Sequence, residues 1–354
     1  MTSVSSIDVL NLTTDELRKK FVDLGIEPYR ADQVHQWIYE KGVYDFERMT
    51  NLSVALRERL KNEFTVELPK AVERQRSDDD KSVKLLLELK KGDCVEAVYM
   101  PRTGGKRALC ISSQVGCKFH CAFCASGQNG FLRNLSMGEI LGQVLLARDE
   151  APDKKVTNIV FMGIGEPFDN YREMMRTVRQ LNSKTAFGIG SRKITISTCG
   201  VIPKIEMLGN EGLQVELSVS LHGPNDTVRG AVMPVNTAYP VKPLIEACKK
   251  YSQKTKRAIT FEYILLKGVN ASVKEAGQLA RLLKGMLCKV NLIPYNPIEE
   301  FPHEPPTYDE TVAFQNVLKQ AGINTTVRFS KGQDIQAACG QLRSVRTKKN
   351  KLLE

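Results

Sequence analysis

The sequence predicts an α/β protein that joins a partial (β/α)6 TIM-like barrel to a small N-terminal helical domain and a β-hairpin extension. Three patterns carry this prediction: helical spacing in residues 12–70, two β-like runs around "KGD", and six alternating strand and helix segments from residue 107 onward. Alternating units of this kind form a parallel sheet with right-handed crossovers. Six units are two fewer than a closed eightfold barrel contains, so we expect an open, partial barrel.

The N-terminal part reads as three helices. The stretch "LTTDELRKKFVDLGI" begins with a Thr-x-x-Glu signal for a helix start, and residues 30–42 and 53–64 follow with helical spacing. We therefore place a helical accessory domain at residues 1–72. Runs 82–90 and 94–100 flank "KGD" as in a hairpin, which predicts a β-hairpin extension at residues 73–102.

The barrel core is expected at residues 103–333. Its predicted strands are 107–113, 158–163, 193–198, 215–221, 259–265 and 289–295. Its predicted helices are 136–150, 171–182, 201–210, 241–255 and 272–286, with a last helix at 308–322 before a strand at 325–330. Residues 334–354 form a C-terminal segment that holds Cys339 and the basic tail "RSVRTKKNK".

Composition limits the classes of function. No apolar run approaches the roughly 18 residues that span a bilayer, and the N-terminus lacks the pattern of a signal peptide, so we expect a cytoplasmic protein without a membrane partner. The net charge of +11 fits a nucleic-acid partner or only a solvated basic surface. The nine cysteines argue against a disulfide framework, and Cys199, Cys248 and Cys288 are interpreted as buried small hydrophobic residues.

The stretch "VGCKFHCAFCASG" at 115–127 has the density of a metal site. Its three cysteines, Cys117, Cys121 and Cys124, have C-x3-C-x2-C spacing and follow the first predicted barrel strand. A zinc site would need a fourth ligand such as His120, but a loop that points Cys121 inward turns the preceding residue away. Three thiolates can instead hold three irons of a [4Fe–4S] cluster and leave the fourth iron open to a small chelating ligand.

This spacing after the first strand of a β/α barrel resembles the radical S-adenosylmethionine (SAM) superfamily, and so does "GEP" at 165–167. The resemblance implies a radical SAM barrel with one [4Fe–4S] cluster per chain, whose open iron takes the amine and carboxylate of SAM. Reduction then cleaves SAM to a 5′-deoxyadenosyl radical. The positions that match SAM contacts cluster at the carboxyl ends of predicted strands: Gly165, Glu166, Ser197, Ser220, Leu221, His222 and Asn296.

Longer stretches resemble the RlmN/Cfr family of RNA adenine methyltransferases, and the helical domain resembles the RlmN branch. They are "CISSQVGCKFHCAFCASGQNGFLRNLS", "FMGIGEPFDN", "ITISTCGVIPKI", "SVSLHGPNDTVRGAVMPVN", "NLIPYNP" and "DIQAACGQL". The resemblance implies that one SAM methylates Cys339 and a second generates a methylene radical there, so that two SAM are consumed per turnover. The radical adds to adenine carbon 2, Glu96 takes the ring proton, and Cys110 releases the product by forming a transient disulfide with Cys339.

The same resemblance implies the partners. They are one adenosine of the peptidyl-transferase centre in 23S rRNA, the adenosine 3′ of the tRNA anticodon, and a flavodoxin- or ferredoxin-type electron donor. We expect a monomer, with candidate RNA contacts in the helical domain, Arg192, Lys193, Arg328 and the basic tail. Two alternatives stay open. A Cfr-type carbon-8 methyltransferase is favoured slightly by "CASGQNG" and disfavoured by "GEPFDN"; a cluster-bearing RNA-binding or sensor protein would not need Cys339.

Overall fold

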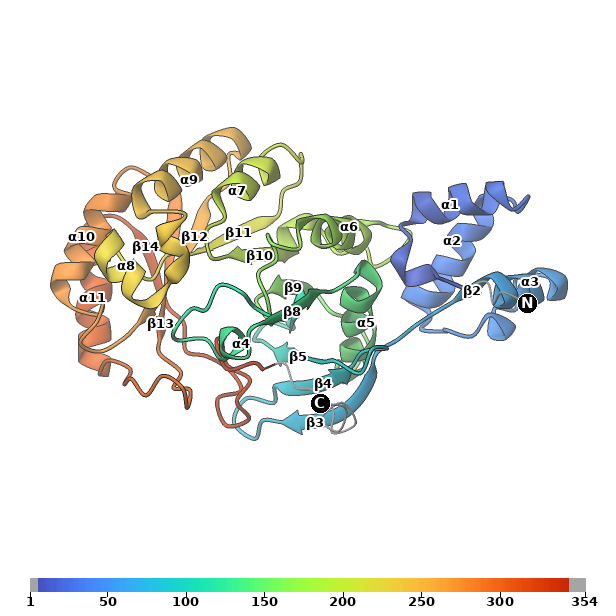
Figure 1. The fold of residues 1–354 in the computed structure, drawn as a ribbon, viewed down its shortest axis with the longest axis horizontal. Helices are drawn as coiled ribbons and strands as arrows, with labels where there is room; N and C mark the ends of the chain where they lie inside the picture. Colours follow the sequence, from blue (N-terminus) through green and yellow to red (C-terminus); the bar gives the residue numbers. More distant parts are fainter. Residues whose placement is uncertain (1–5, 344–354) are drawn as a thin grey trace.

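A ten-stranded sheet, in the order β14-β13-β12-β11-β10-β9-β6-β5-β4-β3, runs through the molecule (Figure 1). The computed structural model describes residues 6–343. Neighbouring strands from β6 to β14 are all parallel. They are β6 (Arg107–Cys110), β9 (Asn158–Phe161), β10 (Ile194–Thr198), β11 (Glu216–Ser220), β12 (Ile259–Leu265), β13 (Cys288–Pro294) and β14 (Asn324–Val327). The predicted open (β/α) barrel is therefore confirmed, with the strand predicted at 325–330 as its outermost member.

Helices connect these strands and cover the sheet (Figure 1). Helix α6 shows why they do so, because Met174, Val178 and Leu181 fall on one helical face and are fully or almost fully buried. The helices of the barrel are α5 (Met137–Ala147), α6 (Tyr171–Asn182), α7 (Ile202–Leu208), α8 (Asp226–Val232), α9 (Val241–Thr255), α10 (Val273–Leu283) and α11 (Tyr308–Gln320). All but the short α8 correspond to predicted segments.

The extension contains one more strand than the hairpin that we predicted. Strands β4 (Val83–Glu88) and β5 (Cys94–Pro101) pair as expected, and β5 continues the barrel sheet by pairing antiparallel with β6. Strand β3 (Lys70–Arg76) adds a third antiparallel strand. Residue 72, where we expected the helical domain to end, lies within β3, whose largely exposed and charged residues give no apolar alternation to detect.

The N-terminal helical domain consists of α1 (Thr14–Asp23), α2 (Tyr29–His35) and α3 (Val54–Glu63). The predicted start of the first helix is a complete capping box between Thr13 and Glu16. The helix predicted at 30–42 is α-helical only to His35 and continues as one π-helical turn, Gln36–Glu40. A short parallel pair, β1 (Ile7–Asp8) with β2 (Phe64–Thr65), closes the domain.

Buried polar contacts fix this domain against the barrel. Arg148, which follows α5, donates to the backbone carbonyls of Tyr39 and Ile38 and to the Tyr44 hydroxyl (3.2 Å). The backbone amide of Gly138 in α5 donates to the Asn11 side chain at 2.8 Å. In Figure 1 the helical domain stands to one side of the barrel, beside α5 and α6.

Short elements that we did not predict surround the cysteine-rich loop. Strands β7 (Gln114–Gly116) and β8 (Phe131–Asn134) pair antiparallel on either side of it, and α4 (Ala125–Gln128) follows Cys124. Gly116 has a φ of +75°, and a Cβ there would lie 1.9 Å from the Gly130 carbonyl oxygen. Only glycine fits this close approach of two backbones. Within residues 6–343, no helix combines the length and apolar character needed to cross a bilayer.

Candidate functional site

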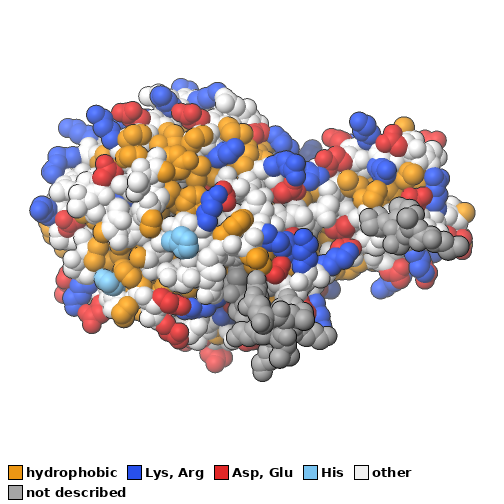
Figure 2. Space-filling model, in the orientation of Figure 1, with side chains coloured by type: hydrophobic (Ala, Val, Ile, Leu, Met, Phe, Trp, Pro, Cys, Tyr) orange, Lys and Arg blue, Asp and Glu red, His pale blue; other side chains and the backbone are white. Residues whose placement is uncertain are grey.

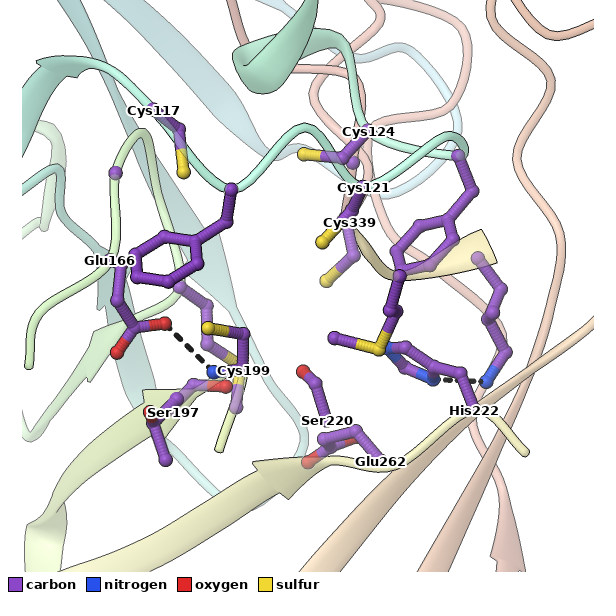
Figure 3. Close-up of a pocket in the computed structure, with 18 of the residues that line it drawn as sticks. Cys117, Cys121, Cys124, Glu166, Ser197, Cys199, Ser220, His222, Glu262 and Cys339 are labelled. Atoms are coloured by element: carbon purple, nitrogen blue, oxygen red, sulfur yellow. Dashed lines mark hydrogen bonds between the residues drawn. The ribbon is translucent and has the colours of Figure 1, made fainter. Parts of the chain in front are cut away.

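A cavity of about 160 Å³ lies at the carboxyl ends of the barrel strands, beneath the cysteine-rich loop (Figure 3). Eight of the ten residues that we predicted to hold the cluster or SAM line it: Cys117, Cys121, Cys124, Gly165, Glu166, Ser197, Ser220 and His222. Cys339 lines it as well. Residues that are far apart in sequence therefore meet here because each follows a strand of one parallel sheet.

The three loop thiols point into this cavity (Figure 3). Burial raises the pKa of Cys117 to about 12 and also raises the pKa values of Cys121 and Cys124, so without a metal all three would be neutral thiols. Metal binding requires thiolates, and a bound cation supplies the compensating charge. The donor set therefore fits an iron–sulfur cluster, in which each thiolate binds a different iron.

A single zinc ion fits these residues less well. In residues 6–343, no three His, Cys, Asp or Glu side chains come close enough together to hold one metal ion. His120, the candidate fourth ligand, has a φ of +48°, and its Nδ1 lies 2.9 Å from the Gly127 carbonyl oxygen. His120 does not line the cavity.

The "GEP" loop places backbone rather than a free carboxylate toward the cavity. Gly165 has a φ of +99°, and a Cβ there would lie 2.5 Å from the Gln114 Cβ. The Glu166 carboxylate accepts hydrogen bonds from the backbone amides of Cys199 (2.7 Å) and Phe168 (3.0 Å). Burial raises the pKa of Glu166, and these bonds oppose that rise. The carboxylate thus ties the loop after β9 to the end of β10.

His222 lies at the end of β11 in a left-handed conformation, with φ of +53°. Its Nδ1 accepts a hydrogen bond from the backbone amide of Ile264 at 2.9 Å, and its ring packs edge-on against Phe123. Burial lowers the pKa of His222 to about 3, so the ring is neutral at ordinary pH. Because Nδ1 is the acceptor, the ring proton resides on Nε2.

Two predicted SAM contacts lie outside the cavity lining. Leu221 is fully buried in the core. The Asn296 side chain donates to the Ser330 hydroxyl (2.8 Å) and to the Cys339 carbonyl oxygen (3.2 Å), and accepts from Gln333 (2.7 Å). Asn296 therefore holds the C-terminal segment in place, which its sequence position after β13 did not reveal.

Cys110 and Cys339 meet at a second, smaller cavity of about 20 Å³. Both are free thiols, as are the other seven cysteines. Cys110 ends β6, and burial raises its pKa to about 12. The segment around Cys339 is held to α4, because Ala125 donates to the Gly340 carbonyl oxygen (2.7 Å) and Ser126 donates to that of Leu342 (2.8 Å). Cys339 thus borders both cavities.

Glu96, the predicted proton acceptor, is buried in β5 but lines neither cavity. Its carboxylate accepts from the backbone amide of Arg343 at 2.8 Å and pairs with Lys84 at 3.3 Å. Burial raises the pKa of Glu96, and Lys84 opposes that rise. Glu96 therefore contacts the C-terminal segment a few residues beyond Cys339.

The candidate RNA contacts are dispersed. Arg192 and Lys193 are exposed but precede β10, so they lie at the end of the barrel away from the cavity. Arg328 is not on the open surface; it lines both cavities, with a terminal nitrogen 3.7 Å from the Cys339 sulfur. The basic tail beyond Arg343 lies outside the described residues.

Cys199 and Glu262 line the cavity, although sequence analysis assigned neither residue to the site. Cys199 is buried as we expected, yet it lines the cavity. Its position directly after β10 could have indicated that Cys199 lines the cavity, because the other strand ends carry candidate site residues. Glu262 lies in the middle of β12 and is only 5% exposed. A single charged residue inside the apolar run "ITFEYIL" was the signal in its case, since unpaired glutamates are rarely buried.

Comparisons with known proteins agree with this arrangement. Residues 7–66 match the ribosomal RNA large subunit methyltransferase N-terminal domain, and residues 111–280 match the radical SAM superfamily. The chain is 46% identical to a probable dual-specificity RNA methyltransferase RlmN of Thermoanaerobacter sp. (strain X514), with 94% of this chain and 96% of the relative covered. It is 45% identical to a protein of the same name from Clostridium tetani, with 97% and 98% covered.

A solved structure extends the agreement to the whole fold. A radical SAM methyltransferase from Sphaerobacter thermophilus superposes with a TM-score of 0.91 at 42% identity, covering 95% of this chain and 99% of that one. The resemblance drawn from the sequence motifs is thereby confirmed. The chain belongs to the RlmN family of radical SAM methyltransferases.

Proposed function

We propose that this enzyme methylates carbon 2 of one adenosine in the peptidyl-transferase centre of 23S rRNA and of the adenosine 3′ of the tRNA anticodon. One observation carries the proposal. Two free thiols, Cys110 and Cys339, share a cavity, and Cys339 also borders the cavity of the thiol trio. A methyltransferase that passed the methyl group directly from SAM to RNA would need neither thiol.

The chemistry of the target explains why a carrier thiol is useful. Adenine carbon 2 lies between two ring nitrogens and is too electron-poor to attack the methyl group of SAM. Cys339 would accept the methyl group of one SAM. Removal of a hydrogen atom from this S-methyl group, by the radical that a second SAM would supply, would let its carbon bond to carbon 2, so that the base stays attached to Cys339. Cys110 would then attack the Cys339 sulfur and free the methylated RNA, which leaves a disulfide.

The remaining roles follow from position and charge. Cys117, Cys121 and Cys124 would hold a [4Fe–4S] cluster, which when bound supplies the single electron that cleaves SAM. The backbone of Gly165 and Glu166, with Ser197, Ser220 and His222, would orient SAM. For Glu96 to accept the ring proton, the segment that carries Arg343 must shift, because this segment now occupies the carboxylate.

Charge supports RNA as the substrate. The net charge of +11 favours a polyanion, and Figure 2 shows Lys and Arg side chains on the visible face where the helical domain meets the barrel. The cavity is recessed, so an adenosine must leave its stack to reach Cys339. We expect a cytoplasmic monomer reduced by a flavodoxin- or ferredoxin-type donor.

The test is mass spectrometry of nucleosides from rRNA and tRNA treated anaerobically with the reconstituted enzyme, SAM and a reductant. We expect 2-methyladenosine from the wild type and none from Cys339→Ala. Cys248→Ala, which alters a buried cysteine outside both cavities, is the matched control. Formation of 8-methyladenosine instead would show that the enzyme methylates carbon 8 rather than carbon 2. Wild-type protein without methylated adenosine, or an active Cys339→Ala variant, would overturn the proposal.

A further inference from the structure

Glu262 lines the main cavity with a carboxylate that has one oxygen without a hydrogen bond. Its Oε1 accepts hydrogen bonds from the Ser218 hydroxyl and the Asn291 side-chain amide, each at 3.1 Å. Its Oε2 is buried and has no hydrogen-bond partner. A buried polar atom without a partner is costly and uncommon, so this oxygen is suited to a donor that arrives with a ligand. Figure 3 shows Glu262 beside Ser220 at the cavity wall.

Arg328 lies between Glu262 and the carrier thiol. One terminal nitrogen, Nη1, is 4.0 Å from Glu262 Oε2, and the other, Nη2, is 3.7 Å from the Cys339 sulfur. Nη1 is also 3.7 Å from the Met162 sulfur. Sulfur is a weak acceptor, so the guanidinium retains donor capacity toward the cavity. Burial raises the pKa of Glu262, while Arg328, Asn291 and Ser218 favour its charged form.

We propose that Arg328 and Glu262 form a recognition pair that selects adenine as the base methylated at this site. The proposal rests on the function proposed above. Along the wall, the order is carrier sulfur, hydrogen-bond donor and hydrogen-bond acceptor. Along one edge of adenine, the order is carbon 2, the acceptor N1 and the donor 6-amino group. The order of groups along the cavity wall therefore complements the order along this edge of adenine when carbon 2 faces Cys339.

The same pair opposes guanine. Guanine presents an N1–H donor where Arg328 offers donors, and a carbonyl oxygen where Glu262 offers an acceptor. Buried hydrogen-bonding groups that would be left unpaired by guanine discriminate strongly in favour of adenine. The other edge of adenine repeats the order with carbon 8, N7 and the 6-amino group. The pair therefore selects the base, while the choice between carbons 2 and 8 depends on other contacts.

The substitution Glu262→Gln should replace the hydrogen-bond acceptor that faces the cavity with a hydrogen-bond donor. The Ser218 and Asn291 donors will hold the amide oxygen, which leaves the NH₂ group of glutamine facing the cavity. The substrates are two RNA oligonucleotides, one with the target adenosine and one with purine riboside, which lacks the 6-amino group. We expect the wild type to prefer adenosine and the variant to lose that preference by about tenfold or more. Comparing the ratio between proteins cancels the different intrinsic reactivity of the two bases.

Three further measurements complete the experiment. Glu246→Gln, on the exposed face of α9, is the matched control and should keep the wild-type ratio. The ratio of the affinities for the two oligonucleotides is measured by fluorescence anisotropy. It reports the base preference even if the variant methylates RNA too slowly to measure. Methylation of Cys339 without RNA reports any effect on SAM.

The outcomes separate the two proposals. An unchanged preference in Glu262→Gln, together with slower Cys339 methylation, would assign Glu262 to SAM and overturn the recognition pair alone. A wild-type enzyme that does not distinguish the two oligonucleotides would overturn it as well. A wild-type enzyme that methylates neither would overturn the proposed function, and the pair with it.

Discussion

The carboxylate of Glu166 and the imidazole of His222 are both held by backbone amides at the edge of the main cavity. Such bonds fix a side chain without placing a second mobile side chain beside it. If these residues bind SAM as proposed, they are oriented before the ligand arrives, which lowers the cost of ordering them on binding. Glu262 Oε2 and the Arg328 guanidinium differ, because each keeps hydrogen-bonding capacity unused.

The first prediction concerns Cys110. If this thiol releases the product from Cys339, Cys110→Ala should still attach RNA to Cys339 but should not free it. We expect a covalent protein–RNA species at up to one equivalent, visible as a shifted band on a denaturing gel, and at least a hundredfold loss of multiple turnover. Cys248→Ala is the control. Normal turnover by Cys110→Ala, without an adduct, would contradict the role of Cys110.

For single residues, the sequence predicts a place in the site where neighbouring residues in the chain form a recognisable motif. Cys117, Cys121 and Cys124 were predictable because their spacing alone indicates a metal site. Asn296 lies at an expected strand end, but its hydrogen bonds to a distant segment direct it away from the cavity. Glu262 was missed because its proposed role depends on Arg328, which follows β14 and is near Glu262 only in space.

Among the elements, those with strong apolar periodicity were predicted most accurately. Helix α6 has buried residues at helical spacing, and β12 is an almost continuously buried apolar run. Both were predicted with the bounds that the structure shows. Strand β3 is exposed, and α8 contains glycine and the fully buried Arg229, so neither carries the expected pattern. The cysteine-rich loop has short elements, β7, β8 and α4, that depend on tertiary contacts rather than on local propensity.

The second prediction concerns His35 at the end of α2. His35 is fully buried against Thr14, and burial lowers its pKa to about 3, with a smaller contribution from Arg18. Between about pH 3 and pH 6.5, the unfolded domain binds a proton at His35 that the folded domain does not. Stability is therefore lost as pH falls below about 6.5, by up to about 1.4 kcal/mol per pH unit from this group.

His35→Gln should make this pH dependence shallower by nearly one proton. The measurement is urea denaturation at pH 7, 6 and 5, followed by fluorescence of Trp37, the single tryptophan, which lies in the same domain. Other titrating groups, including His222, affect both proteins equally and cancel in the comparison. Equal slopes for the variant and the wild type would show that His35 is protonated in the folded domain.

The whole molecule joins two domains that the sequence separates. The barrel contains the cavities, and the helical domain is fixed to α5 and α6 by buried polar contacts such as those of Arg148. The general architecture was predictable because repeated β/α units allow few topologies. The relative placement of the domains was not, since Arg148 pairs with backbone carbonyls that no sequence pattern identifies.

The third prediction concerns charge across the molecule. Replacing Lys348, Lys349 and Lys351 of the basic tail by Glu should weaken RNA binding and reduce the dependence of log K on log salt by up to about two to three. Lys249, Lys250 and Lys254 on the outer helix α9, replaced in the same way, give the same change in net charge. Affinity measured by filter binding from 50 to 200 mM salt distinguishes the two sets. Equal effects would assign the attraction to overall charge rather than to the tail.

The docking of the C-terminal segment on α4 also has a consequence for the timing of protein synthesis. Cys117, Cys121 and Cys124 leave the ribosome long before Cys339, whose segment contacts the residues that follow Cys124. A nascent chain therefore has the complete thiol trio while one wall of its cavity is still missing. If the trio holds a cluster and Cys339 carries the methyl group, as proposed, iron and sulfide would be delivered through that side. Translation of the later segment would then close it, so that cluster assembly would precede the arrival of the methyl carrier.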